Sequence, residues 1–221
     1  MWYGIGIIIR RLPRTTISHA PPCLLNDANT AYDAAYEHYG KQGQSGYLAG
    51  AINAYPAYKY IHLLGHSAGA KLIDEAASHI ALNNTAKPFL HITFLDSYTR
   101  DDNDKINYGG LPIDYPHYAE HYVDDGPADC ADATLASAFN FHITGWVPDR
   151  DDKLGELGHQ WPRRWYTRSI KSPDGTGELG FKLSLEGGSE AYSTLSQQFP
   201  PGGICVLTDV LSTAICGIKL R

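Results

Sequence analysis

Apolar residues in the middle of the chain follow two different spacings. The runs Tyr60–Leu64 and Phe89–Asp96 are nearly continuous, which is typical of parallel strands buried on both faces. Between them, the apolar positions of residues 68–82 recur every three or four residues and predict an amphipathic helix. A strand, a helix and a second strand of these lengths form a right-handed unit, so we expect both strands to end at the same edge of a parallel sheet.

The same spacings predict further elements on either side of this unit. The predicted strands are Gly4–Arg10 and Phe139–Thr144, with a strand-like run at Gly180–Leu185, and the predicted helices are Asn26–Tyr39, Tyr47–Tyr55 and Pro162–Ile170. Thr99–Gly126 is rich in Asp, Tyr, Pro and Gly and predicts one long excursion over the sheet edge, while the tail from Pro200 predicts a turn and a β-hairpin. We therefore expect one α/β domain over residues 1–221, with its core at about residues 56–170 and a C-terminal appendage at 171–221.

The composition of the chain argues against some classes of binding partner and structure. A net charge of −6 without a basic cluster argues against nucleic-acid binding. No apolar run reaches transmembrane length, and the first ten residues are apolar before they are basic, the reverse of a signal peptide, so the compartment stays open. Four scattered cysteines do not form a disulfide scaffold or a zinc motif; a Cys205–Cys216 bridge and free buried thiols both stay open.

The first strand and the helix are joined by the pentapeptide Gly65-His66-Ser67-Ala68-Gly69. Gly-x-Ser-x-Gly between a strand and a helix is typical of a nucleophile elbow, a strained turn in which a side chain at either glycine would crowd the strand–helix crossing. Ser67 is therefore the candidate nucleophile, and the Ala68 N–H at the helix N-terminus is a candidate oxyanion donor. The alternative is a tight turn with an incidental serine.

A serine nucleophile needs a histidine base, and the base needs a carboxylate to orient it. Asp96 ends the next strand, and His159 lies on a loop between a strand and a helix, so we expect both at the edge that carries Ser67. The competing acids are Asp124 and Asp125, and the competing bases are His117, His121 and, as the strongest of them, His142. His66 is expected to point away from the serine, and His62 and His91 to be buried strand residues.

These segments resemble the α/β-hydrolase superfamily. His62–Ala70 carries a Gly-His-Ser-x-Gly-Ala elbow and Ile92–Tyr98 carries Leu-Asp at a strand end, which is similar to the pancreatic and lipoprotein-lipase-like branch. In that branch the acid follows the strand after the nucleophile strand, so the resemblance also assigns Asp96. Gly158–Tyr166 resembles the histidine segment of related bacterial lipase-like hydrolases, and the resemblance covers about residues 60–170.

The resemblance implies an α/β-hydrolase-type, mostly parallel sheet flanked by helices, with two departures from the family. Only 66 residues precede Ser67, so we expect either an abbreviated N-terminal part or a fragment with an unrelated start. The second oxyanion donor is unassigned because no His-Gly segment follows an early strand. The residues after Asp96 are Ser97-Tyr98, where the family has Pro-Ala.

The expected function is that of a serine hydrolase, esterase- or lipase-like, which cleaves small-molecule or lipid esters through an acyl-enzyme. Ser67 attacks, His159 moves the proton, and Asp96 orients His159, with no metal or cofactor. Two alternatives stay open. One is a catalytically impaired scaffold that acts as a binding protein, and the other is a thioesterase or acyltransferase that uses the same residues.

Overall fold

The computed structural model describes residues 5–9, 43–55, 57–99, 102–124, 134–145, 159–171, 179–185 and 192–208. These residues form a mixed α/β structure around a six-stranded sheet in the order β1-β2-β3-β4-β5-β6. The strands are β1 (Ile5–Ile9), β2 (Tyr60–Ser67), β3 (Phe89–Ser97), β4 (His117–Val123), β5 (Phe139–Gly145) and β6 (Ile204–Thr208). Five neighbouring strands, β2 to β6, are parallel, and β1 pairs with β2 in the antiparallel direction.

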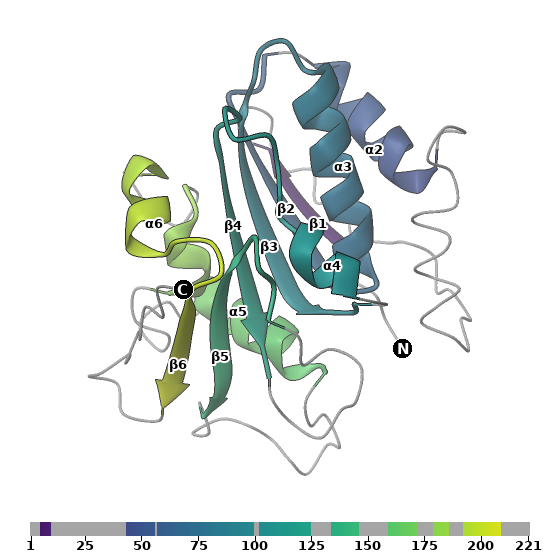
Figure 1. Ribbon diagram of the computed structural model, residues 1–221. Helices are drawn as coiled ribbons and strands as arrows, with labels where there is room; N and C mark the ends of the chain where they lie inside the picture. The colour runs from purple at the N-terminus through teal and green to yellow at the C-terminus, as the bar shows by residue number, and fades with distance from the viewer. Residues whose placement is uncertain are drawn as a thin grey trace.

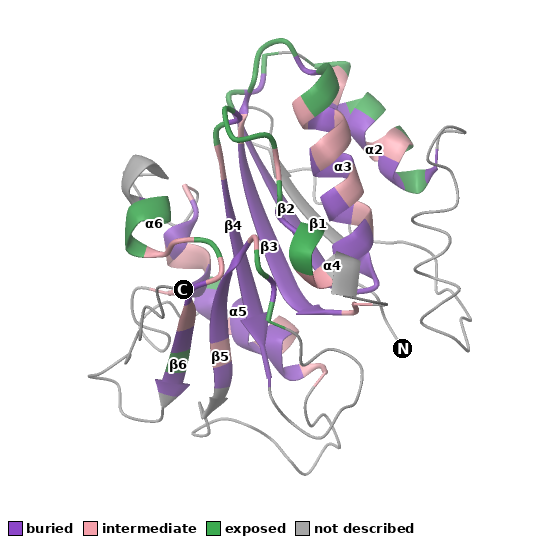
Figure 2. Ribbon diagram, viewed as in Figure 1, coloured by how far each residue is buried: buried purple, intermediate pink, exposed green. Residues whose placement is uncertain are grey.

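The helices form a layer on each face of the sheet (Figure 1). One face is covered by α2 (Gln44–Asn53), α3 (Gly69–Asn83) and α4 (Asp102–Asn107), and the other by α5 (Trp161–Lys171), the 3₁₀ helix η3 (Gly180–Leu183) and α6 (Tyr192–Gln198). Strand alternation sends Ile61 and Leu63 into the first core and Leu64 into the second. Figure 2 shows that the central strands are buried along most of their length.

The unit β2–α3–β3 confirms the prediction made from the apolar spacings. The two strands are parallel and in register from Tyr60 opposite Phe89 to His66 opposite Leu95. Their carboxyl ends therefore meet at one edge of the sheet, which we call the carboxyl edge. The antiparallel β1 places its first residue, Ile5, opposite Gly65, so its start rather than its end lies toward this edge.

Thr99–Gly126 is not one long excursion. It contains α4 and the buried strand β4, whose residues alternate between the two faces of the sheet. Burial reaches even the ionisable side chains, since Glu120 and His121 are both fully buried. The prediction was wrong because these polar residues interrupt the apolar run that normally identifies a parallel strand.

The C-terminal part also differs from expectation. The run Gly180–Leu185 contains a 3₁₀ helix rather than a strand, and its first residue has φ of +67°, a conformation that glycine adopts readily. The strand expected in the hairpin after Pro200 is β6, but it pairs in parallel with β5. Cys205 on β6 is disulfide-bonded, and the other three cysteines lie outside the described residues.

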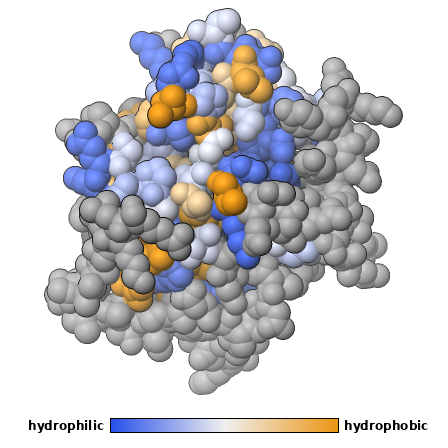
Figure 3. All heavy atoms as spheres, viewed as in Figure 1, coloured by the Kyte–Doolittle hydropathy of each residue, from blue (hydrophilic) through white to orange (hydrophobic). Residues whose placement is uncertain are grey.

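Some predicted features fall outside the described residues, among them the helix Asn26–Tyr39. In the part of the chain that is described, no helix has the length and apolar character needed to span a membrane. Within the described ranges, the large apolar side chains that are exposed are Tyr47, Tyr55, Leu82, Ile106, Ile113, Ile170 and Val206. They come from different elements, and Figure 3 shows isolated hydrophobic side chains among hydrophilic ones, which is ordinary for a protein surface.

Candidate active site

Ser67 lies in a strained turn between β2 and α3. Its φ is 57°, which is uncommon for a residue with a side chain. A Cβ atom added to Gly65 would lie 2.5 Å from the carbonyl oxygen of Gly69, closer than real Cβ contacts. The strand and the helix therefore cross at a distance that only glycine permits, as expected for a nucleophile elbow.

Asp96 lies on the neighbouring strand at a β-bulge. His66 pairs with Leu95 and Ser67 pairs with Ser97, so Asp96 is the extra residue on β3. Its φ of 46° is also in the left-handed region. A bulge re-aims the side chain that it carries, and here it takes the Asp96 carboxylate out of the regular alternation of the strand.

His159 pairs with Asp96 across 63 residues of sequence. Its Nδ1 lies 2.6 Å from Asp96 Oδ2, and the two side chains are 14% and 2% exposed. A carboxylate accepts hydrogen bonds, so Nδ1 carries the proton and Nε2 presents a lone pair. The structure thus brings the predicted base and the predicted acid together, in the orientation that proton transfer through Nε2 requires.

Ser67 is next to this pair in the fold but is not joined to it by a hydrogen bond. Among the described residues, none links Ser67 Oγ to His159. The backbone carbonyl of Ser67 accepts from the N–H of Tyr98 at 3.2 Å, which ties the ends of β2 and β3 together. Ala68, the N-cap of α3, is buried beside the serine, in the position expected of an oxyanion donor.

The competing bases occupy other places. His117 starts β4 at the opposite edge of the sheet, and its Nδ1 lies 2.8 Å from the carbonyl of Tyr115. His121 accepts from the Ser97 N–H at 3.2 Å and donates to Asn140, within the sheet. His142 lies inside β5 and alternates with Phe141, which faces α5.

Of the three candidate acids, Asp96 is the one that the structure pairs with His159. Asp124 follows β4 and is buried, but the carboxylate bonded to His159 is that of Asp96. Asp125 lies outside the described residues.

His66 belongs to the site in a way that the sequence did not reveal. Its side chain contacts His159: the Nε2 of His66 lies 2.6 Å from the carbonyl oxygen of His159, and the centroids of the two rings are 4.6 Å apart. Burial lowers the pKa of His66 to about 3, and the nearby charge of His159 acts in the same direction. The signal in the sequence was a polar residue on the inward face of a buried strand, two positions after Leu64.

A second group of buried polar side chains lies deeper on the α5 face of the sheet, and we call it the central polar network. Its members are Tyr60, His62, His91, Thr93, Glu120 and Tyr122. Glu120 accepts from His91 Nε2 at 3.1 Å, from Thr93 Oγ1 at 2.8 Å and from Tyr122 OH at 3.0 Å. Burial raises the pKa of Glu120 to about 7, against the opposing effects of the hydrogen bonds from Thr93 and Tyr122 and of the nearby charge of His62. His62 and His91 are thus buried strand residues, as predicted.

The central polar network contains a set of possible metal ligands, because atoms of His62, His91 and Glu120 all lie within 4.8 Å of one another. The two imidazole rings are nevertheless stacked, with centroids 4.2 Å apart and planes only 11° from parallel. A metal bound to a ring nitrogen lies near the plane of that ring, and two stacked parallel planes share no such position. The arrangement fits a hydrogen-bonded network better than a metal centre.

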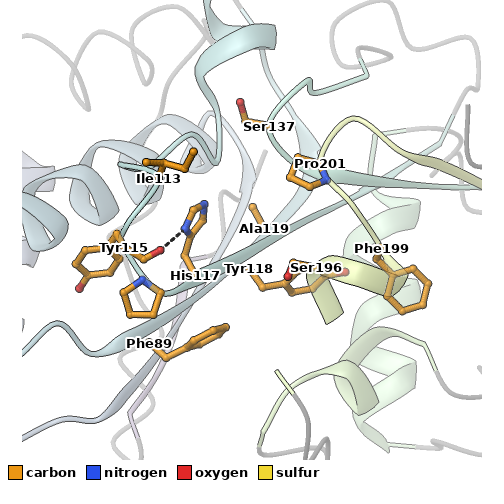
Figure 4. A pocket seen from close by; sticks show the side chains of 11 residues that line it. Phe89, Ile113, Tyr115, His117, Tyr118, Ala119, Ser137, Ser196, Phe199 and Pro201 are labelled. Atoms are coloured by element: carbon orange, nitrogen blue, oxygen red, sulfur yellow. Dashed lines mark hydrogen bonds between the residues drawn. The ribbon is translucent and has the colours of Figure 1, made fainter. Parts of the chain in front are cut away.

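A pocket of about 480 Å³ lies away from the candidate active site. Its lining includes Phe89 and His117, at the amino ends of β3 and β4, and residues of α6 and of the turn after α6 (Figure 4). These strand ends form the edge opposite Ser67. This pocket is therefore not positioned to bind an ester beside Ser67.

No protein-family model, curated protein sequence or solved structure matches this chain.

Proposed function

We propose that the protein is a serine hydrolase that cleaves carboxylic esters of small molecules or lipids, on an α/β-hydrolase-type sheet. One observation carries the proposal: the His159–Asp96 pair lies at the carboxyl edge where Ser67 occupies a strained strand–helix turn. A base whose Nδ1–H is held by a carboxylate, beside a serine in such a turn, is the arrangement that activates serine for acyl transfer.

In the proposed reaction, Ser67 Oγ attacks the carbonyl carbon of the ester and its proton passes to His159 Nε2. Asp96 keeps the imidazole in the tautomer that can accept this proton and stabilises the cation that forms. His159 then gives the proton to the departing alkoxide, which leaves an acyl group on Ser67. Water attacks the acyl-enzyme with His159 as base, which releases the carboxylic acid and restores the serine.

The Ala68 N–H, at the N-terminus of α3, is the proposed donor to the oxyanion of the tetrahedral intermediate. A second donor is not assigned. The last described residue of β1, Ile9, pairs with Ile61 near the amino end of β2, away from Ser67.

The missing Ser67–His159 hydrogen bond favours the second candidate, a catalytically impaired scaffold that binds ligands without turnover. Hydrogen bonds between nucleophile and base are often long before substrate binds, so the esterase proposal leads. A thioesterase or acyltransferase would use the same residues, and the relative kcat/KM values for an ester and its thioester analogue distinguish these activities.

The test is labelling with a fluorophosphonate probe together with hydrolysis of short-chain p-nitrophenyl esters. We expect labelling and hydrolysis by the wild-type protein, and neither by Ser67→Ala. Ser196→Ala is the matched control, since Ser196 is an exposed serine on α6, and it should behave like the wild type. A folded wild-type protein that neither labels nor hydrolyses esters would refute the proposal and favour the binding scaffold.

A further inference from the structure

His66 makes the only described hydrogen bond to the backbone of His159. The His66 Nε2–H donates to the His159 carbonyl oxygen at 2.6 Å, a short bond between segments 93 residues apart. The His66 ring also lies against the His159 ring, with centroids 4.6 Å apart and planes at 37°. His159 is therefore held twice, through its side chain by Asp96 and through its backbone by His66.

Packing alone does not explain a histidine at this position. Residue 66 is 1% exposed in the core that contains Leu64 and Leu95, where an apolar side chain would be buried at lower free-energy cost. Among the described residues, His66 Nδ1 has no hydrogen-bond partner, so the Nε2–H bond to residue 159 is the polar interaction that offsets burial of the ring.

The neighbouring contacts show what this bond controls. His159 and Gln160 form the turn before α5, and the helix itself is fixed to β5 by Trp161 Nε1, which donates to the Ile143 carbonyl at 3.2 Å. Trp161 thus fixes the start of α5. The backbone of His159, two residues earlier, is held by its own contact, the hydrogen bond from His66.

We propose that His66 is a positioning residue that fixes the backbone and ring of His159 so that Nδ1 stays on Asp96 and Nε2 faces Ser67. This inference rests on the proposed function, because positioning is meaningful only for a base that transfers protons. His66 itself takes no proton from substrate: it acts through His159, and a displacement of about 1 Å at a reacting group can lower turnover a hundredfold.

Two substitutions separate the donor from the ring. His66→Phe keeps an aromatic ring beside His159 and removes the N–H, whereas His66→Gln removes the ring and keeps an amide donor near the position of Nε2. We expect His66→Phe to lower kcat for p-nitrophenyl ester hydrolysis by about tenfold to a hundredfold with little change in KM. His66→Gln should recover most of the lost kcat. If His66→Phe does not fold, His66→Met provides the donor-free comparison.

A spectroscopic measurement tests the same inference without turnover. A histidine Nδ1–H that is bonded to a buried carboxylate gives a far-downfield proton resonance, and Asp96→Asn assigns that resonance by abolishing it. We expect the resonance in the wild type and in His66→Gln, and its loss or upfield movement in His66→Phe. A global loss of stability without local displacement would not produce this pattern.

The outcomes distinguish this inference from the proposed function. If folded His66→Phe had the same kcat as the wild type and an unchanged downfield resonance, the positioning role would be overturned while the esterase proposal stands. A kcat in His66→Gln as low as in His66→Phe would also overturn it, because the donor would then not be the feature that matters. A wild-type protein without esterase activity or probe labelling would refute the proposed function itself, whatever the resonance shows.

Discussion

The His159–Asp96 pair lies at the carboxyl edge of the sheet, and the His91–Glu120 pair lies in the interior of the same sheet. Both contain a buried carboxylate hydrogen-bonded to an imidazole. The two pairs differ in backbone conformation and in exposure to solvent. Asp96 has a left-handed φ at a bulge and His159 is 14% exposed, whereas His91 and Glu120 are fully buried in regular strands.

A buried histidine–carboxylate pair does not by itself indicate catalysis. The interior pair hydrogen-bonds to other strand residues, such as Thr93 and Tyr122, and so belongs to a network that links the strands of the sheet. At the carboxyl edge, strain at Ser67 and Asp96 is held by the surrounding fold, and strain of this kind concentrates at functional sites. Backbone geometry and access separate the two pairs where residue type does not.

Neutralising each carboxylate in turn should give the largest difference between the two pairs. Asp96→Asn should lower kcat for ester hydrolysis by on the order of 10⁴-fold, because an amide that donates to Nδ1 reverses the tautomer and removes the base. Glu120→Gln should leave kcat close to the wild-type value. The kcat values are measured under conditions in which circular dichroism shows that both variants are folded. Similar losses of kcat in the two variants would mean that the interior pair also serves the reaction.

The next largest effect concerns stability against pH. Burial raises the pKa of Glu120 from 4.5 to about 7, so the native state holds a proton that the unfolded chain has released. The stability that this proton contributes is fully present below pH 4.5 and is lost as the pH rises toward about 7. The contribution is on the order of 3 kcal/mol over this range. Glu120→Gln carries no such proton and should lack this dependence.

The measurement is urea unfolding of wild type and Glu120→Gln at several pH values across this range. The unfolding free energy of the variant, relative to wild type, should rise by on the order of 3 kcal/mol between pH 4.5 and 7 and level off above it. His66 and His121, whose pKa values burial lowers to about 3 and about 4, give the opposite dependence. Both are present in the two proteins and cancel in the difference. A constant difference across the range would contradict the raised pKa.

The sequence predicted those parts of the fold in which the type of residue and its spacing indicate the same element. The βαβ unit and the roles proposed for Ser67 and Asp96 followed from continuous apolar runs, a helical period and a glycine-flanked serine. The role proposed for His159 followed from its place on a loop between a strand and a helix and from a family resemblance. The strand β4 did not, because Glu120 and His121 become buried only through hydrogen bonds to other strands. The contact of His66 with residue 159 did not either, because nothing local marks a partner 93 residues away. Nor does any sequence spacing mark the bulge at Asp96.

The smallest effects test the strained turn itself, with two glycines as a matched pair. Gly65→Ala places a methyl group 2.5 Å from the Gly69 carbonyl oxygen, so β2 and α3 must separate; we expect a loss of about 1–3 kcal/mol in unfolding free energy. Gly50→Ala adds the same methyl group to exposed α2, where nothing lies within 4 Å, and should stabilise by up to about 1 kcal/mol. Probe labelling of Ser67 should fall in the first variant and persist in the second. If Gly65→Ala were as stable and as reactive as wild type, the close crossing would not be what holds the serine in its strained conformation, and the contrast between the strained edge and the regular interior would lose its physical basis.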